Sequence, residues 1–473
     1  MISIGNLQIN KLYLGDVEVT KAYLGDVQVY GSTPQPVVKY MTMTVLDGEA
    51  GTTIAPTLNG SFSTKPNLQY RINNGSWSDF VFGTTAAITA KTGDTVQWKG
   101  LNPNGVSTSY NDYLNFSISG NPVALSGNVM SLIDGVGDTT LIPCNYCFCR
   151  LFQDSSIKTV SSDFLPATTL ADRCYSSMFS SCTSLVNAPE LPATTLASDC
   201  YEGMFFNCTS LKNVTELPAT TLTERCYNSM FYGCTSLTTA PELPATTLAV
   251  SCYAEMFSGC TSLVTAPVLP ATTLAVSCYT DMFSGCTSLV TAPVLPATTL
   301  AERCYYRMFL ECTSITTAPE LPATTLANMC YCEMFYGCTA LETAQSLHAT
   351  TLAESCCSWM FQECTSLKVV PEILTATTLA DSCYCGMFYG CTSLTTAPEL
   401  PATILTNSCY LSMFSGCKNL NYIKCLSTDI TASDALYNWL NSVSSSGTFV
   451  KPAGVSYETG KSGIPSGWTV EEI

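Results

Sequence analysis

A short apolar pattern recurs along most of this chain and predicts its main secondary structure. In one copy the apolar positions are Cys226, Tyr227, Met230, Phe231 and Cys234, which are spaced i, i+1, i+4, i+5 and i+8. This spacing is typical of one face of a helix. The residues between them vary most from copy to copy and are often charged, which indicates the solvent side of that helix.

The residues around this pattern set the bounds of the predicted elements. Pro218 lies where a helix interior would not tolerate it, and the hydroxyls of Thr220 and Thr221 could cap a first turn. The helix is therefore expected over about residues 222–233. The downstream segment TSLTTAPEL combines β-branched residues with alternation and predicts a short strand that ends at Pro241. Each unit should contain one strand and one helix.

This unit occurs ten times with a period of 26 residues, and its consensus is LPATTLAxxCYxxMFxGCTSLTTAPE. One extra residue near Ile373 breaks the period. A fixed period between about 20 and 50 residues predicts a solenoid, in which each unit buries its apolar face against its neighbours. The copies begin at Leu165, Leu191, Leu217, Leu243, Leu269, Leu295, Leu321, Leu347, Leu374 and Leu400.

The MFxGCTSL core at residues 230–237 and the LPATTL turn at residues 217–222 resemble the bacterial leucine-rich repeats of the BspA type. The resemblance extends over all ten copies, although the usual BspA-type unit is shorter than this one. It implies an α/β leucine-rich repeat solenoid, which should curve because helices need more space than strands. It also implies adhesion or recognition at cell surfaces, without a particular ligand.

The segments on either side of the repeats predict further domains. Residues 36–135 alternate apolar with polar positions between Gly, Asn and Pro turns, which predicts an all-β sandwich-like domain. Residues 136–164 keep parts of the repeat without its spacing, so the solenoid is expected to span residues 136–425 with a degenerate cap at its start. Residues 426–473 should close it with a helix at 429–443 and two strands, in GTFVKPAG and SGWTVEEI.

A second, shorter repeat occupies residues 1–32. It reads IGNLQI, LGDVEV and LGDVQV, with Gly5, Gly15 and Gly25 ten residues apart. Gly-Asn and Gly-Asp between alternating apolar residues predict β-hairpins. Hairpins of this size bury little by themselves, so we expect a docking or anchor unit. They resemble the short leaders on structural proteins of phages that infect gut Bacteroidetes.

The beginning of the chain, MISIGNLQINK, enters a strand pattern directly. It lacks the basic start, apolar stretch and cleavage site of a secretory signal. No run of 18 apolar residues predicts a membrane span either. Together with the resemblance of residues 1–32, this leads us to expect a virion protein assembled in the host cytoplasm, with a bacterial cell surface or extracellular location as the alternative.

Cysteine is abundant, with 27 residues in the chain, of which twenty belong to the repeats at two per unit. Cys226 and Cys234 would lie about 12 Å apart along the predicted helix, too far for a disulfide. We therefore expect buried thiols that pack as small apolar side chains. Cys144, Cys147 and Cys149 in PCNYCFCR are a candidate metal site, but a CxxC without a second pair or a histidine is insufficient, and no metal is expected.

Catalysis has little support in the composition. His348, the only histidine, takes the second position of LHATTL, where most copies have Pro, and this indicates a substituted turn residue. The 36 acidic residues allow carboxylate pairs, but none is marked by its surroundings. We expect no enzymatic activity and no cofactor. The net charge of −17 also disfavours nucleic acid and anionic membranes as partners.

Two surfaces are candidate binding sites. Strand alternation turns the residue after each core leucine outward, in a column that is β-branched in most copies: Thr238, Val264, Val290, Thr316 and Thr395. The predicted helix face instead varies and includes side chains of the types found in interface hot spots: Tyr305, Tyr306, Arg307, Trp359 and Tyr410. Ordinary β-propensity also explains the first set, and a solvated helix surface explains the second.

Three functions are compatible with these patterns. The first is a non-enzymatic virion fibre or appendage, which binds a host surface glycan or protein through the solenoid and joins other virion proteins through residues 1–32. The second is an architectural capsid or tail component without a receptor role. The third is a host-encoded surface adhesin. None of them requires nucleic acid or membrane insertion, and copies of the chain could associate with one another.

Overall fold

The computed structural model describes residues 38–473 apart from residue 49, and, within residues 1–37, only six strand segments. These six segments pair antiparallel, two by two, as the ten-residue spacing predicts. The glycine positions of the predicted turns lie outside the described residues. The pairs are β1 (Ile2–Ile4) with β2 (Leu7–Ile9), β3 (Leu12–Leu14) with β4 (Val17–Val19), and β5 (Ala22–Leu24) with β6 (Val27–Tyr30).

Residues 38–160 contain two β-sheets with a common core. Six strands run in the order β10-β9-β12-β7-β14-β15, and three in the order β11-β8-β13. Side chains alternate between buried and half-exposed along β7 and β12, because each strand turns one face to the core. Trp98 and Phe116, from different sheets, meet edge to face at 4.9 Å between ring centroids. The strands are β7 (Met41–Val45), β8 (Thr52–Asn59), β9 (Gln69–Ile72), β10 (Ser78–Asp79), β11 (Ile88–Ala90), β12 (Thr95–Lys99), β13 (Tyr113–Gly120), β14 (Val123–Ser126) and β15 (Ile157–Val160).

The larger sheet takes its last strand from the segment expected to cap the solenoid. β15 pairs parallel with β14, whereas the other strand pairs of both sheets are antiparallel. Two short helices lie in the same region, α1 (Ser131–Asp134) and the 3-10 helix η1 (Ser162–Phe164). The Phe152 ring packs at a tilt against Phe116 of β13, with centroids 5.8 Å apart, and stacks on Phe179 of the first repeat at 5.5 Å. One apolar core therefore continues from the sheets into the solenoid.

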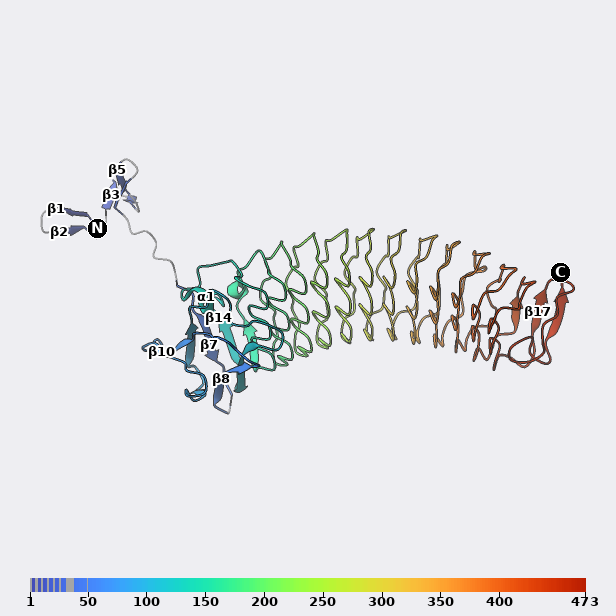
Figure 1. Ribbon diagram of the computed structural model, residues 1–473, viewed down its shortest axis with the longest axis horizontal. Helices are drawn as coiled ribbons and strands as arrows, with labels where there is room; N and C mark the ends of the chain where they lie inside the picture. The colour runs from blue at the N-terminus through green and yellow to red at the C-terminus, as the bar shows by residue number, and fades with distance from the viewer. Residues whose placement is uncertain are drawn as a thin grey trace.

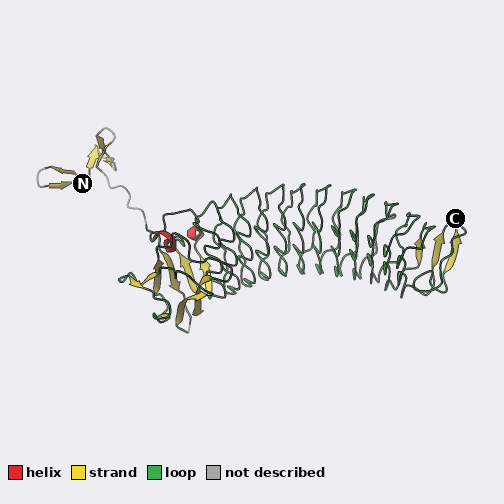
Figure 2. Cartoon of the chain, viewed as in Figure 1, coloured by secondary structure: helices red, strands yellow, loops and turns green. Residues whose placement is uncertain are grey.

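The repeats form a solenoid, but the predicted helix in each unit is wrong. Between residues 165 and 425, all of which are described, there is no helix, and the coils are drawn as loop up to the strands at the C-terminal end (Figure 2). Alternate N–H groups close short turns within a unit, as when Met230 donates to the carbonyl of Tyr227 at 3.3 Å. The others donate to the next coil, as Phe231 does to Met256 at 3.0 Å. We call this part of each unit the turn coil.

The turn coil has a period of four residues. Arg225, Ser229 and Gly233 have φ values of 52°, 51° and 67°, in the left-handed region, so the backbone reverses at every fourth residue. In an α-helix, positions eight apart are rotated by about 80° relative to each other, because each residue turns about 100°. With a four-residue period, Cys226 and Cys234 return to the same side, and both are completely buried. The apolar spacing i, i+1, i+4, i+5, i+8 matches this geometry better than a helix.

Aromatic rings stack from coil to coil inside the solenoid. Phe231, Phe257 and Phe283 lie 5.7 Å apart between ring centroids, with their planes within 7°. A parallel column of tyrosines runs from Tyr175 to Tyr331. This spacing on the turn-coil side is close to the spacing of paired β-strands, about 4.8 Å, which applies to the bridged side. The two sides of the stack therefore differ little in length. The stack accordingly curves only gently (Figure 1).

The opposite side of each unit is held by isolated parallel bridges rather than by full strands. The predicted strand contributes one bridging position per coil, as between Thr239 and Thr265. A second bridge column joins the LPATTL segments, as between Thr247 and Thr273. The second threonine of most LPATTL segments is therefore a bridge residue. The prediction that Thr220 and Thr221 cap a helix is wrong, because no helix follows them.

The C-terminal end closes the stack with a three-stranded parallel sheet of β16 (Tyr422–Lys424), β17 (Thr448–Lys451) and β18 (Thr469–Glu472). The two predicted closing strands are confirmed. The predicted helix at 429–443 is wrong, because this segment is another turn coil with φ near 53° at Asp434 and Asn438. Trp439 stacks on Tyr410 at 6.3 Å. No helix among the described residues has the length and apolar character needed to cross a bilayer.

Candidate functional site

The segment between the two bridge columns is extended in every unit, and its side chains alternate between core and solvent. In one unit Leu243 and Ala245 are buried, whereas Glu242, Pro244 and Thr246 are exposed. Because neighbouring units repeat this alternation in register, each exposed position forms a column along the stack. We call the surface made by the positions equivalent to residues 238–247 the extended face.

Paired threonines form the most regular column of the extended face. Each LPATTL segment contributes two adjacent exposed residues, and the last pair has one isoleucine. Backbone hydrogen bonds fix the column, as when Thr272 donates to the carbonyl of Thr246 at 3.2 Å. Within the described structure, Thr350 alone in this column donates its hydroxyl to a protein group. The column consists of Thr168, Thr169, Thr194, Thr195, Thr220, Thr221, Thr246, Thr247, Thr272, Thr273, Thr298, Thr299, Thr324, Thr325, Thr350, Thr351, Thr377, Thr378, Thr403 and Ile404.

The first predicted binding column lies on this same face. All five of its members are exposed, and Val264 and Val290 each retain 49% of their accessible surface. They are next to the first bridge column, for example Val264 beside Thr265. Their exposure is compatible with ligand contact, but the role of Thr238, Val264, Val290, Thr316 and Thr395 stays a prediction.

The second predicted set does not form one surface. Tyr305 and Tyr410 are each only 1% exposed, so the prediction that they contact a ligand is wrong. Tyr305 belongs to the internal tyrosine column, and Tyr410 stacks between Tyr384 and Trp439. Tyr306, Arg307 and Trp359 are half-exposed on the turn coils. The Arg307 guanidinium donates to Glu333 at 2.8 Å and lies 4.8 Å from the Tyr306 ring.

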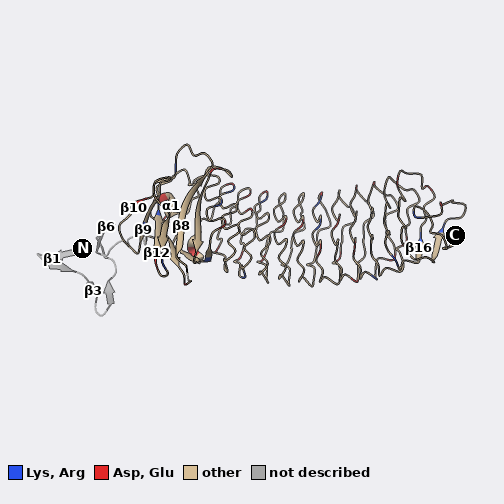
Figure 3. Cartoon of the chain, turned by 90° about the horizontal axis from the view of Figure 1, so that it is seen from below, with Lys and Arg blue, Asp and Glu red and all other residues tan. Residues whose placement is uncertain are grey.

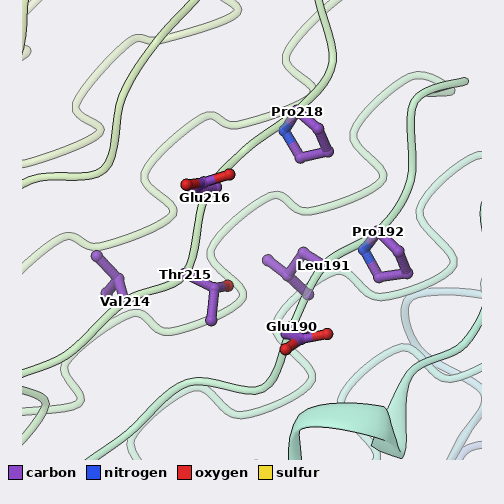
Figure 4. Close-up of a pocket in the computed structure, with 7 residues that line it drawn as sticks. All are labelled: Glu190, Leu191, Pro192, Val214, Thr215, Glu216 and Pro218. Carbon is purple, nitrogen blue, oxygen red and sulfur yellow. The ribbon is translucent and has the colours of Figure 1, made fainter.

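Hollows occur on the extended face between consecutive units. One of about 440 Å³ is lined by Glu190, Leu191, Pro192, Val214, Thr215, Glu216 and Pro218 (Figure 4). Its two glutamates begin an exposed column that continues with Glu242 and then changes to Val268 and Val294, which are 80% and 77% exposed. Most other positions of the solenoid are neither acidic nor basic (Figure 3). The face is therefore polar, hydroxyl-rich and locally acidic.

A partly buried carboxylate lies on the turn coils rather than on the extended face. Burial raises the pKa of Asp281 to about 6, and Arg307 opposes this shift while Glu255 and Glu333 add to it. The carboxyl is ionised at neutral pH at a cost to the folded state, because its pKa in the unfolded chain is lower. The free energy of unfolding should therefore increase as the pH falls from about 6 to about 4, because the Asp281 carboxyl becomes protonated and its burial no longer carries a cost.

We expect Asp281→Asn to raise the free energy of unfolding at pH 7.5 by about 1–2 kcal/mol, allowing for solvent screening. Denaturant titrations at pH 7.5 and pH 4.5 measure this effect, which should be much smaller at the lower pH. Glu354→Gln, at an exposed position of another turn coil, is the control and should change little at either pH. Equal stabilisation at both pH values would contradict the burial argument.

The cysteines are free and, apart from Cys144, buried. The second cysteine of each unit donates its thiol to a phenylalanine carbonyl of the preceding coil, as Cys260 does to Phe231 at 3.1 Å. The prediction of buried thiols that pack in the core is confirmed. Cys144 and Cys147 converge on Gly105, where an added Cβ would meet their sulfurs at 2.3 and 3.4 Å.

No group of three His, Cys, Asp or Glu side chains within the described part of the chain could hold a metal ion. Cys149, the third cysteine of PCNYCFCR, is buried beside Ser176. His348 lies on the extended face, 3.7 Å from Glu320 between Nε2 and Oε2, and both side chains are more than half exposed. The exposed groups of the extended face can offer hydrogen bonds, apolar contacts and, at its glutamates, negative charge.

The threonine column was missed as a candidate site by the sequence reasoning, although its signal was present. The TT pair is among the least variable parts of the unit. It received a structural role as a helix cap only because a helix was expected after it. Because no helix follows, the recurrence of this pair in nearly every unit indicates instead an exposed column that presents the same hydroxyl groups.

Comparison with known proteins identifies the repeat. The family model described as "BspA type Leucine rich repeat region (6 copies)" matches residues 172–316, 250–387 and 328–444. A search of curated proteins found no significant match. Among solved structures, a chain of the "Crystal structure of TLR13-ssRNA13 complex" aligns with 15% identity and a TM-score of 0.27. The alignment covers 65% of this chain and 41% of that one.

Proposed function

This chain belongs to the BspA-type leucine-rich repeat family, and from that premise we propose that it is a non-enzymatic protein that binds a host surface glycan through the extended face. Repeats of this family suggest a role in protein interaction or adhesion. The threonine column is the observation that carries the more specific proposal. It presents the same pair of hydroxyls in nearly every unit, which suits a ligand that is itself a repeating polymer.

The chemistry of the face favours an uncharged polysaccharide. A threonine hydroxyl both donates and accepts hydrogen bonds, as sugar hydroxyls do. The exposed methyl groups and the valines Val264, Val268, Val290 and Val294 offer apolar contact to the C–H surfaces of sugar rings. Glu190, Glu216 and Glu242 lie on the same face and would repel a polyanion.

We expect an array of uncharged cell-surface polysaccharides to contain a ligand for the full chain, and the combined variant Thr246→Val, Thr272→Val and Thr298→Val to bind it at least about tenfold more weakly. Valine keeps the β-branched shape of the column, while each lost hydrogen bond costs about 0.5–1.5 kcal/mol. Binding can be measured by titration calorimetry on the polysaccharide identified in the array.

The matched control replaces three exposed threonines outside the extended face, in Thr235→Val, Thr261→Val and Thr287→Val. It should bind as the unchanged protein does. The proposal fails if no uncharged polysaccharide binds, or if the two triple variants lose affinity equally. Binding of a host surface protein instead would assign the same face to a protein receptor.

We also propose that the chain is a virion fibre or appendage, attached to other virion proteins by residues 1–32. Three separate pairs of strands, each strand only three or four residues long, support a docking role, because units so small need a partner to bury apolar surface. Deleting residues 1–32 should abolish incorporation into particles. Normal incorporation of the truncated chain would refute attachment through this segment.

Two alternatives lead to different outcomes in these experiments. An architectural capsid or tail component would need residues 1–32 for incorporation but would bind neither polysaccharides nor host cells. A host-encoded adhesin would be found on bacterial cells rather than on particles. The location of the full chain in a producing culture, determined by fractionation, separates the adhesin from both virion functions.

A further inference from the structure

A cluster of two aromatic rings and two cations lies on the larger sheet, far along the chain from the repeats. Tyr40 and Trp77 meet edge to face, with ring centroids 4.8 Å apart. The Arg71 guanidinium carbon lies 4.7 Å from the Trp77 ring and 5.2 Å from the Tyr40 ring. The Lys99 ammonium lies 4.5 Å from Trp77 and 5.9 Å from Tyr40. All four residues are half-exposed.

The strands place the two cations of this cluster on the outer face of the sheet. In β12, Val96 and Trp98 point into the core, so Gln97 and Lys99 point outward. Register pairs Gln97 with Arg71 of β9 and with Thr42 of β7. Neighbouring strands therefore bring together residues that are far apart in the sequence.

A hydrogen-bond chain orients the guanidinium. The Nε of Arg71 donates to Oε1 of Gln97 at 2.7 Å, and Nε2 of Gln97 donates to the Thr42 hydroxyl at 3.2 Å. No bond to a protein acceptor is formed by the two terminal nitrogens of Arg71 within the described residues. The guanidinium of Arg71 is thus held in one orientation, and its two terminal nitrogens can donate hydrogen bonds to a planar carboxylate.

In the part of the chain that the structure describes, the positive charge of the cluster has no acidic partner. Among residues 38–473 other than residue 49, neither Arg71 nor Lys99 forms an ion pair within 4 Å. The carboxylate of β10, Asp79, accepts a hydrogen bond from Gln69 instead. In a chain with a net charge of −17, two adjacent cations without a carboxylate are unusual.

We propose that Tyr40, Arg71, Trp77 and Lys99 form a second binding site, which takes a carboxylate-bearing sugar unit of an acidic polysaccharide. The two cations would bind the carboxylate, Arg71 in bidentate fashion. Gln97 and Thr42 supply amide and hydroxyl groups for sugar hydroxyls, and the exposed parts of the two rings supply apolar contact. A phosphate ion, by contrast, would contact only the two cations and would gain nothing from the aromatic rings.

This site is independent of the extended face and goes beyond the function proposed for it. The extended face carries exposed glutamates and suits an uncharged polymer, whereas this cluster is cationic. Variants of one surface should leave the other unchanged, because the two surfaces share no residue. Failure of either proposal can therefore be recognised without reference to the other.

The test uses the full chain and oligogalacturonate as the probe. We expect measurable binding, weakened at least tenfold in Arg71→Gln with Lys99→Gln and similarly in Trp77→Ala. The matched control is Lys65→Gln with Lys91→Gln, which removes two exposed cations from the same part of the protein and should bind as before. Thermal melts of all variants exclude unfolding as the cause of a loss.

Three further probes identify the ligand class. A neutral galactan of similar length, polyglutamate and inorganic phosphate should each bind at least tenfold more weakly than oligogalacturonate. Equal binding of polyglutamate would overturn the sugar assignment in favour of an acidic peptide. Equal binding of phosphate, an unchanged affinity in Trp77→Ala, or an equal loss in the lysine control would each overturn the site.

Discussion

Phe257→Ala should lower the free energy of unfolding of the solenoid by about 3–5 kcal/mol. Phe257 is completely buried and stacks on Phe231 and Phe283, each at 5.7 Å between ring centroids. The change removes both stacks and leaves a cavity between two rigid neighbouring coils. Because each coil contacts only its neighbours, the loss should divide the stack into two parts that unfold less cooperatively.

Chemical denaturation followed by circular dichroism measures this effect as a lower midpoint and a broader transition. The control is Val250→Ala in the same turn coil, where the side chain is 41% exposed and the change should stay within about 0.5 kcal/mol. Similar midpoints for the two variants would show that the phenylalanine column contributes no more to the free energy of unfolding than an exposed side chain does.

The native protein should react rapidly with a thiol reagent at one position, Cys144, while the other 26 cysteines react at least about a thousandfold more slowly. A hydrogen bond from Cys147 lowers the pKa of Cys144 and opposes the effect of burial. In the repeats, burial raises the pKa of thiols such as Cys182 and Cys260 to about 12. Cys356 has a lowered pKa as well, through Cys357, but is completely buried.

Titration with an aromatic disulfide at pH 8 should therefore release about one equivalent quickly, and 27 equivalents after denaturation. Cys144→Ser should remove the fast phase, whereas Cys149→Ser should leave it intact, because Cys149 is completely buried. Several equivalents in the fast phase would mean that the coils open far more readily than their packing implies.

The solenoid and its repeat boundaries could be predicted from the sequence, but the backbone of the unit could not. Five apolar positions at i, i+1, i+4, i+5 and i+8 match both a helix and a series of four-residue turns. The turns require left-handed backbone at residues such as Arg225 and Ser229, which disfavour it by themselves. Hydrogen bonds between neighbouring coils, which a single unit cannot make, decide the outcome.

The expected helix also limited what could be said about binding residues, because it gave the LPATTL threonines a capping role. Tyr305 and Tyr410 were expected outside, although they are equivalent to Tyr227, which the apolar pattern itself places on the buried face. The Trp77 and Arg71 cluster could not be anticipated, because Tyr40, Arg71, Trp77 and Lys99 meet only through the pairing of β7, β9 and β12.

The near identity of two adjoining coils has a genetic consequence. Residues 243–268 and 269–294 differ only at Ala254 and Glu255, which become Thr280 and Asp281. Nearly identical neighbouring gene segments are prone to unequal recombination, which adds or removes whole units. Since every coil presents the same bonds to the next, such an event would lengthen or shorten the threonine column while keeping the stack intact. For the binding function proposed above, the range of ligands would then change by copy number, without a single point mutation.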